Sequence, residues 1–246
     1  MKKPLYIQAR MKKLGKNQKL DLETLRWIKE KSKINKISVQ HFKKDFIPLD
    51  KEKFKIFLPQ KNWFYKKEFI SNIHGMGHTL RVILNSYIIC QLKEYKNYYP
   101  ILIAASIHDI RRKSDKEDPN HGKRAFMWFK KKNLAIKKQL EPLEIEGISM
   151  AIVYHNVPYN KIPKQKLLKF RKYIDILKYA DAMDRFRLPK QKWWPSEQYL
   201  KLNLDKKIFD LSKYLFYETE RLVLEKEFST KNAIILVGLK MKVLKG

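Results

Sequence analysis

Histidine and aspartate side chains gather at inward-facing positions in one part of this chain. Five of the six histidines lie between residues 74 and 155. His78 stands at the start of an expected helix, His108 and Asp109 stand together near the end of the next, and Asp181 follows the apolar face of a later one. An unpaired buried carboxylate costs several kcal/mol, so the two aspartates need a compensating positive charge. These four residues predict a divalent metal site, with the mixed nitrogen and oxygen ligands that suit Mn, Fe, Co, Ni or Zn.

Each histidine also has a simpler interpretation when it is considered alone. A single histidine on an apolar face is more often a hydrogen-bonded core residue or a helix cap than a metal ligand. His41 lies outside this group and is expected at the surface. The metal prediction therefore depends on the four residues occurring together.

The elements expected to position these residues are helices. Only 7 glycines and 10 prolines occur among 246 residues, whereas β-sandwiches need many turn residues. Helical spacing of apolar residues covers residues 77–95, 100–110, 119–132, 142–156, 170–186 and 210–228. The sequence therefore predicts an all-α fold, a helical bundle with helical extensions at its N- and C-terminal ends.

The first 60 residues are interpreted as a basic extension that packs on this bundle. Asp21 is expected to cap a helix over residues 21–33, and Pro48 and Asp50 mark a turn and a cap before residues 51–58. We expect one helical domain over residues 61–246, with its motifs at about 70–190 and C-terminal helices at 191–246.

The stretch SNIHGMGHTLRV contains two histidines four residues apart. Gly75 and Gly77 are expected to interrupt any helix before His78, so the pair does not share a simple helical face. His78, in the first turn, is the expected metal ligand. His74, on a flexible approach, is expected to support a ligand or face the substrate, with an ordinary hydrogen-bonded loop histidine as the alternative.

The order of these residues resembles that of a known family. The chain reads IHGMGHTLRV at residues 73–82, AASIHDIRRKSDKEDPNHG at 104–122, VYHNVP at 153–158 and LKYADAMDR at 177–185. This succession of H, HD, H, H and D is similar to the HD-domain superfamily of metal-dependent phosphohydrolases, in particular its bacterial members with an IHGxGHxxRV opening. The resemblance implies an HD-type helical bundle that hydrolyses a phosphate ester.

The resemblance also implies roles for the matching residues. The metal ligands of the family match His78, His108, Asp109 and Asp181. His121 and His155 match histidines that bind a second ion in two-metal members and handle the substrate phosphate in single-metal members. One or two divalent ions are therefore expected, with Mg added to the metals named above.

Charged residues near the motifs are further candidates. Arg112 and Lys113 are placed to hold phosphate, although solvated loop charges explain them equally well. Asp184 lies one helical turn after Asp181, where it would orient a ligand or pair with Arg185. A structural salt bridge is the alternative for Asp184.

The expected chemistry is hydrolysis by a metal-activated water. A bound metal lowers the pKa of its water toward about 7 and neutralises charge on the phosphoryl oxygens. Asp109 is expected to orient that water or accept its proton. His121 and His155 are expected to stabilise the phosphoryl group or protonate the leaving oxygen.

One position departs from the family pattern. Many relatives have glycine after HDI, where this chain has Arg111. Since glycine would permit a left-handed or tightly packed backbone, Arg111 predicts that the helix continues for at least another residue.

The expected substrate is a nucleotide or a nucleic-acid-derived phosphate ester, cleaved by a phosphomonoesterase or phosphodiesterase. The stretch KQKWWPSEQY places Trp193 and Trp194 beside Lys190 and Lys192. These aromatic rings would stack on a base, but packing against the bundle is the more common role of adjacent tryptophans.

The formal net charge of +30 also suggests nucleic acid as a partner. Only 10 of the 55 basic residues are Arg, however, and Lys spread along the whole chain is also typical of a solvated surface. The alternative function is thus a non-catalytic basic helical module that binds nucleic acid and keeps a structural or relic metal site. A relic site would be expected to lack a ligand, whereas this set is complete.

The expected location is the cytoplasm. The N-terminus lacks the unbroken apolar segment of a signal peptide, and no stretch approaches the roughly 18 to 20 apolar residues of a membrane span. A single cysteine, Cys90, excludes a disulfide within the chain and a cysteine-based zinc site. The sequence does not define an oligomeric state.

Overall fold

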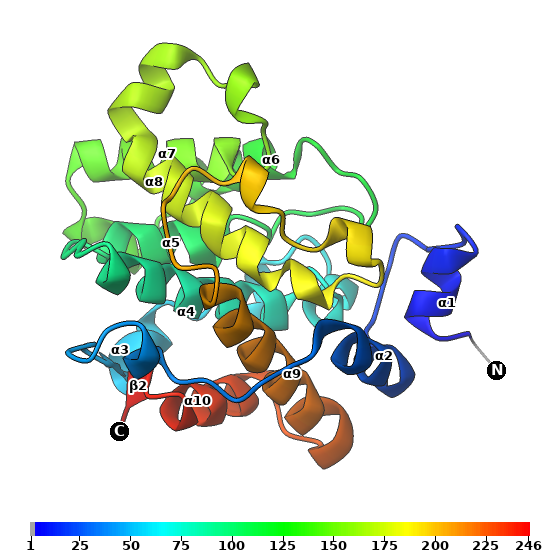
Figure 1. Cartoon of the computed structure of the whole chain (residues 1–246). Coiled ribbons are helices and arrows are strands. Elements are labelled where there is room, and N and C mark those ends of the chain that lie inside the picture. Colours follow the sequence, from blue (N-terminus) through cyan, green and yellow to red (C-terminus); the bar gives the residue numbers. More distant parts are fainter. Residues whose placement is uncertain (1–2) are drawn as a thin grey trace.

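The computed structural model of the chain describes residues 3–246, apart from the side chain of Glu197. Helices dominate these residues, and the only strands among them are two of two residues each, so the predicted all-α fold is confirmed (Figure 1). None of the helices in the described range combines the length and apolar character that a membrane crossing requires.

The elements follow one another along the chain with short connections. The α-helices are α1 (Leu5–Arg10), α2 (Leu22–Ser32), α3 (Lys51–Ile56), α4 (Met76–Leu92), α5 (Tyr99–Ile107), α6 (His121–Lys131), α7 (Pro142–Tyr154), α8 (Lys164–Met183), α9 (Ile208–Lys226) and α10 (Thr230–Lys240). The strands are β1 (Leu49–Asp50) and β2 (Leu244–Lys245). The 3₁₀ helices are η1 (Val39–His41), η2 (Lys61–Trp63), η3 (Lys67–Ser71), η4 (Ala135–Gln139), η5 (Tyr159–Lys161), η6 (Asp184–Arg187), η7 (Gln191–Trp193) and η8 (Glu197–Tyr199).

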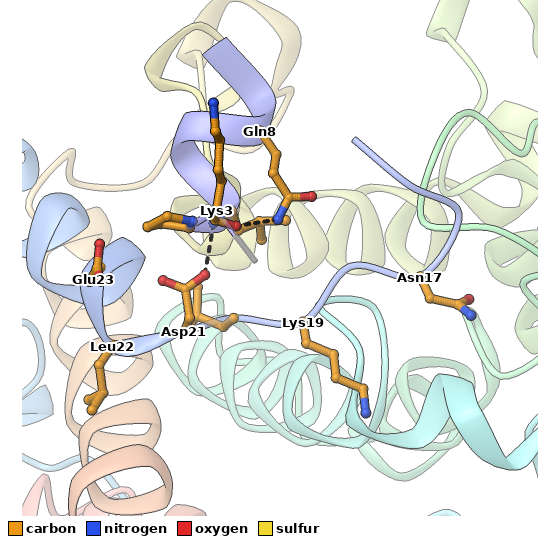
Figure 2. Close-up of a pocket in the computed structure, with 10 residues that line it drawn as sticks. Lys3, Gln8, Asn17, Lys19, Asp21, Leu22 and Glu23 are labelled. Carbon is orange, nitrogen blue, oxygen red and sulfur yellow. Dashed lines mark hydrogen bonds between the residues drawn. The ribbon is translucent and has the colours of Figure 1, made fainter. Parts of the chain in front are cut away.

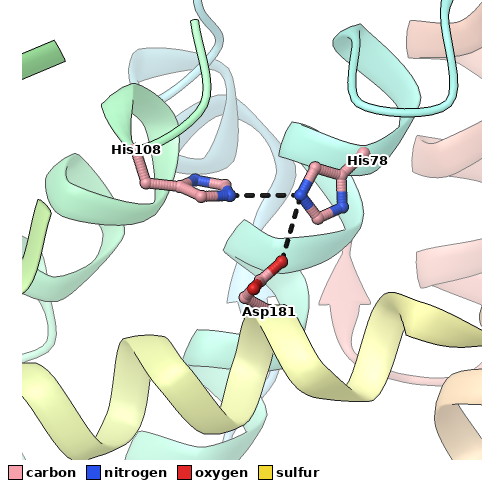
Figure 3. A group of neighbouring side chains, drawn as sticks. All are labelled: His78, His108 and Asp181. Atoms are coloured by element: carbon pink, nitrogen blue, oxygen red, sulfur yellow. Dashed lines mark hydrogen bonds and ion pairs between the residues drawn. The ribbon is translucent and has the colours of Figure 1, made fainter. Parts of the chain in front are cut away.

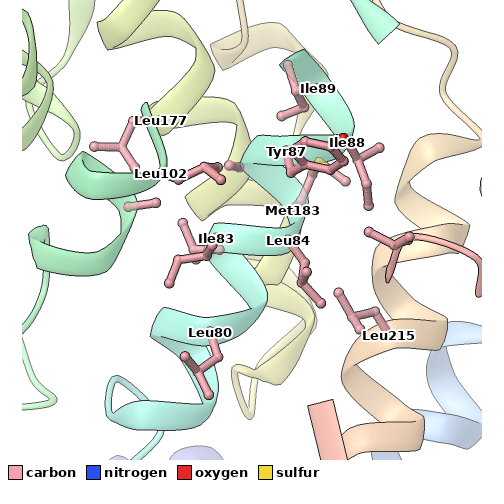
Figure 4. Packing of buried hydrophobic residues seen from close by; sticks show 14 of the residues in the cluster. Leu80, Ile83, Leu84, Tyr87, Ile88, Ile89, Leu102, Leu177, Met183 and Leu215 are labelled. Carbon is pink, nitrogen blue, oxygen red and sulfur yellow. The ribbon is translucent and has the colours of Figure 1, made fainter. Parts of the chain in front are cut away.

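Helix α4 lies at the centre of the hydrophobic core. Every residue from His78 to Cys90 is buried, as expected for a helix that is apolar on all sides. Its side chains face Leu102 of α5, Met183 of α8 and Leu215 of α9 (Figure 4). His78 lies in the first turn of the same helix, so packing of α4 in the core fixes the position of this histidine.

The N-terminal region is fastened to this bundle by caps and by a strand pair. Asp21 accepts a hydrogen bond from the Thr24 amide and caps α2, and its other oxygen accepts one from the Leu5 amide (both 2.8 Å). Asp21 also lines a pocket between α1 and α2 (Figure 2). Asp50 caps α3, and β1 pairs in parallel with β2 near the C-terminus. Both predicted caps are therefore present.

The helix that carries His108 ends earlier than the sequence suggested. Helix α5 stops at Ile107, and the next four residues form turns, so the expectation that it continues at least to Arg111 is wrong. The Ile110 carbonyl accepts a hydrogen bond from the Tyr65 amide (2.8 Å), and the Arg111 carbonyl accepts one from Arg124 Nε (3.1 Å). These carbonyls have partners outside the helix, so the backbone leaves the helical path.

Candidate metal centre

Residues from three helical regions meet at one point. The Nε2 atom of His78 in α4 lies 3.1 Å from His108 Nε2 and 3.3 Å from Asp181 Oδ1 in α8 (Figure 3). Asp109 Oδ2 lies 3.5 Å from the same His78 atom. With bonds of about 2.1 Å, neighbouring ligands of a metal ion lie about 3.0 to 3.4 Å apart. The spacing of these four residues, the first group, therefore fits one divalent ion.

A second set of ligand atoms shares Asp109 with the first. Asp109 Oδ1 lies 2.9 Å from His121 Nε2 and 3.5 Å from His155 Nε2, and the two nitrogens are 2.7 Å apart. An ion about 2.1 Å from all three atoms is geometrically possible at these separations. We call Asp109, His121 and His155 the second group. Asp109 turns one oxygen to each group and could bridge two ions.

Backbone carbonyls fix the orientation of three of the imidazoles. His108 Nδ1 donates to the Ala105 carbonyl, His121 Nδ1 to that of Asp118 and His155 Nδ1 to that of Ile152, at 2.7, 2.5 and 2.7 Å. A carbonyl only accepts hydrogen bonds, so each Nδ1 carries the proton. In the neutral form of each ring, the Nε2 lone pair then faces the centre, as in metal-bound histidines.

Two of these imidazoles are held in the neutral form. Burial lowers the pKa of His108 to about 3 and also lowers the pKa of His155, so these rings stay neutral near pH 7. The Nε2 of neutral His108 lies 3.1 Å from His78 Nε2, so a cation that displaced a proton from His78 would be bound by both nitrogens. The buried histidine and aspartate atoms are therefore close enough together to hold a metal ion.

A buried chain of charges braces His78. Its Nδ1 donates to Asp184 Oδ2 (2.8 Å), and Asp184 Oδ1 accepts from Arg81 Nε (2.6 Å). Arg81 also pairs with Glu220 of α9. Of the two roles predicted for Asp184, the geometry matches orientation of a ligand, since Arg185 is exposed. The sequence predicted no role for Arg81 or Glu220, although an arginine three residues after His78 lies one turn along the same helix.

The charges of the first group are strongly coupled. Burial and Arg187 would lower the pKa of His78, but hydrogen bonds to its carboxylate neighbours raise that pKa to about 9. Burial would raise the pKa of Asp109 and Asp181, but nearby cationic groups and histidines hold both pKa values well below the usual range. Without metal, a proton on His78 thus balances these carboxylates, and a metal ion must displace that proton.

His74 is held firmly beside this group. Its Nδ1 lies 2.9 Å from Asp115 Oδ1, and Asp115 Oδ2 accepts from the Gln18 amide (2.8 Å) and from Asn72 Nδ2 (2.7 Å). The predicted flexible approach is therefore wrong. Helix α4 already begins at Met76, so Gly77 lies inside it rather than before it.

Gly75 has a packing reason to be glycine. It is the N-cap residue of α4, and a Cβ atom there would collide with the backbone carbonyls of Phe69 and Ile70. The close approach brings η3 against the start of α4 and sets the position of His78.

The two basic loop residues differ in position. Arg112 Nη1 lies 3.5 Å from Asp109 Oδ1 and 3.4 Å from His121 Nε2, so it touches the second group. Lys113 is exposed, and its ammonium lies over the ring of Tyr65 (5.1 Å) rather than beside the histidines. The structure brings only Arg112 to the site.

A cavity of about 580 Å³ lies beside the cluster. Its lining includes Lys12, His74, Arg112, Arg185, Lys190 and Trp193. Trp194 instead packs inward, with its Nε1 donating to the Leu188 carbonyl (2.9 Å) and its ring against Trp27 and Phe186. The adjacent tryptophans are thus divided between the cavity and the core.

The fold and this cluster define an all-α protein with a buried histidine and aspartate group suited to a divalent metal. No protein-family model, curated protein or solved structure matches the chain. The functional assignment therefore depends on the geometry of the cluster.

Proposed function

We propose that the chain is a metal-dependent phosphohydrolase of the HD type, which cleaves a phosphate ester with a metal-activated water. The observation that supports the proposal is the convergence of histidine Nε2 atoms around Asp109, with the Nδ1 atoms of His108, His121 and His155 committed to backbone carbonyls. Such a group suits a cation, which would bind the Nε2 atoms and balance the carboxylate charge. The first group, His78, His108, Asp109 and Asp181, would hold the ion.

The chain supplies the remaining chemistry through residues beside the ion. The bound metal would lower the pKa of a water to about 7 and neutralise charge on the phosphoryl oxygens. Asp109 would orient this water or take its proton, since it is the carboxylate shared by both groups. Arg112 would donate hydrogen bonds to phosphoryl oxygens, and His121 or His155 would stabilise the phosphoryl group or protonate the leaving oxygen.

The cavity beside the cluster supports a nucleotide as the substrate. Trp193 is half-buried in its wall, with Lys190 Nζ 4.8 Å from its ring centre. A base would stack on this ring, and Lys12 and Arg185 would attract the phosphates. His74 and Arg112 belong to both the cavity wall and the surroundings of the metal group, so a bound nucleotide would reach the ion.

Hydrolysis of a substrate panel tests the activity. The metal-free protein is reloaded with each divalent ion and supplied with nucleotides, cyclic nucleotides and simple phosphate esters. We expect metal-dependent release of phosphate or nucleoside monophosphate, and a loss of about 1,000-fold or more in Asp109→Asn. Glu146→Gln, which changes an exposed ion pair on α7, is the matched control and should be unaffected. Full activity and bound metal in Asp109→Asn would exclude the proposal.

The two tryptophans test the substrate class. We expect Trp193→Ala to raise KM for a nucleotide by about 10-fold with little loss of stability, because stacking contributes about 1 to 3 kcal/mol per base. Trp194→Ala should lower stability instead. If both variants kept the KM of the wild type, the cavity would not be the nucleotide site.

The alternative, a non-catalytic module that binds nucleic acid, gives different results. It would bind single- or double-stranded nucleic acid with a steep loss of affinity as salt increases, and it would hydrolyse nothing on the panel.

A further inference from the structure

The two groups of ligands differ in the cationic side chain that contacts them. Arg112 Nη1 lies 3.5 Å from Asp109 Oδ1 and 3.4 Å from His121 Nε2, two of the three atoms in the second group. Any ion bound by His121 at about 2.1 Å would therefore lie within about 5.5 Å of this nitrogen. A fixed positive charge at that distance disfavours a second divalent ion.

The position of Arg112 is set by its own loop. Its Nε donates to the Ser114 carbonyl (3.3 Å) and its Nη2 to the Lys116 carbonyl (3.2 Å). The loop is held in turn by the Asp115 amide, which donates to the Lys16 carbonyl at 2.8 Å. The Arg112 side chain is only 13% exposed, so its position beside the second group is fixed by packing as well as by these hydrogen bonds.

The arginines near the first group are neutralised by other carboxylates. Arg81 pairs with Asp184 and Glu220, and Arg187 Nη1 donates to the Asp184 carbonyl and lies 3.5 Å from Asp184 Oδ2. Neither of these carboxylates belongs to a ligand group. Arg112 instead shares Asp109 with the ligands themselves. The charge of Arg187 also acts on His78, but Arg112 is the arginine that contacts ligand atoms directly, and these atoms belong to the second group.

We propose that Arg112 makes the two positions unequal, so that the chain holds one divalent ion tightly in the first group while Arg112 takes the electrostatic place of a second ion. The guanidinium then neutralises the phosphoryl group in the second group, and His121 and His155 remain free to contact the substrate oxygens. This inference relies on the metal site of the proposed function but does not require hydrolysis.

Counting bound ions in matched variants tests the proposal. Metal-free full-length protein is titrated with Mn²⁺, and free and spin-coupled ions are followed by electron paramagnetic resonance beside elemental analysis. We expect one tight ion in the wild type, with a second at least about 10-fold weaker. Arg112→Gln should strengthen the second ion by about 10-fold or more and produce the signal of a coupled pair.

Two further variants separate charge from shape. Arg111→Gln removes the same charge one residue away, where the guanidinium contacts the Trp63 carbonyl and the Tyr65 ring, and it should behave as wild type. Arg112→Lys keeps the charge and should keep the second ion weak. Two ions of equal affinity in the wild type, or an unchanged second ion in Arg112→Gln, would overturn this inference alone. No bound ion in any variant would overturn the proposed metal site as well.

Discussion

The first and second groups share Asp109 but are built differently. In the first group, His78 and Asp181 project from within α4 and α8, and a buried chain through Asp184 braces His78. In the second, His121 is the first residue of α6 and His155 the C-cap of α7, and backbone carbonyls orient both rings, as one also does for His108 at the end of α5. Because His78 and Asp181 lie within packed helices, whereas both histidines of the second group lie at helix ends, we expect the first group to bind an ion more tightly.

Removal of one histidine from each group should have the largest and most unequal effect. We expect His108→Gln to weaken the tightest ion by about 100- to 1,000-fold, because it removes a direct ligand. His121→Gln should change that affinity less than about threefold. Isothermal titration with Mn²⁺ or Zn²⁺ measures both constants, and equal losses in the two variants would mean that the groups are not distinct.

The brace behind His78 should have the next largest effect. Asp184→Asn removes the carboxylate that accepts from His78 Nδ1, so we expect a loss of about 10- to 100-fold in affinity for the tight ion. Glu220→Gln is the matched control, because Glu220 contacts Arg81 and not the histidine. It should cost less than Asp184→Asn, and the reverse order would contradict the role given to Asp184.

The protonation of His78 predicts a pH dependence that only the metal-free protein shows. Its pKa of about 9 in the fold lies above the ordinary value of 6.5, so its contribution to stability is present below pH 6.5 and is lost as the pH rises through 9. We expect Tm of the metal-free protein to fall between pH 6.5 and 9, and His78→Gln to lose this slope. The metal-loaded protein should lack it too, since its ligand histidine is unprotonated. A metal-free Tm that stayed level or rose over this interval would show that His78 is not charged there.

A smaller effect is expected from a lysine that contacts the end of α7 beside the second group. Lys178 Nζ donates to the carbonyls of Tyr154, His155 and Val157 at the end of α7, and burial lowers its pKa to about 8. Lys178→Met should lower stability by about 1 to 2 kcal/mol and leave the tight ion unchanged. Chemical denaturation and the same metal titration measure the two quantities. A large loss of tight-ion affinity would show that the groups depend on each other.

Local signals in the sequence were sufficient to predict most of the helices. Asp21 and Asp50 each cap the helix that follows them, and apolar periodicity placed the helices of the bundle. The predicted continuation of α5 to Arg111 was wrong, because the Ile110 carbonyl bonds instead to the amide of Tyr65, which is distant in the sequence. Periodicity describes a helix but does not report which partners compete for its carbonyls.

The candidate site could be predicted as a set of residues but not as a geometry. The histidines and aspartates were recognisable by order and spacing, and the structure brings them within bonding distance of a common centre. Other features of the site depend on contacts between distant segments. These are the ion pair of Arg81 with Glu220, the contact of His74 with Asp115, and the separation of Trp193 in the cavity from Trp194 in the core. Such contacts leave no local pattern in a single sequence.

The most direct measurement is anomalous X-ray diffraction from crystals of the protein grown with Mn²⁺, recorded on both sides of the metal absorption edge. We expect one strong peak about 2.1 to 2.3 Å from His78 Nε2, His108 Nε2 and an oxygen of Asp181, with a weaker peak or none between His121 and His155. Crystals of Asp109→Asn should lose the strong peak. A wild-type map with no peak among these histidines, at saturating metal, would contradict the metal centre.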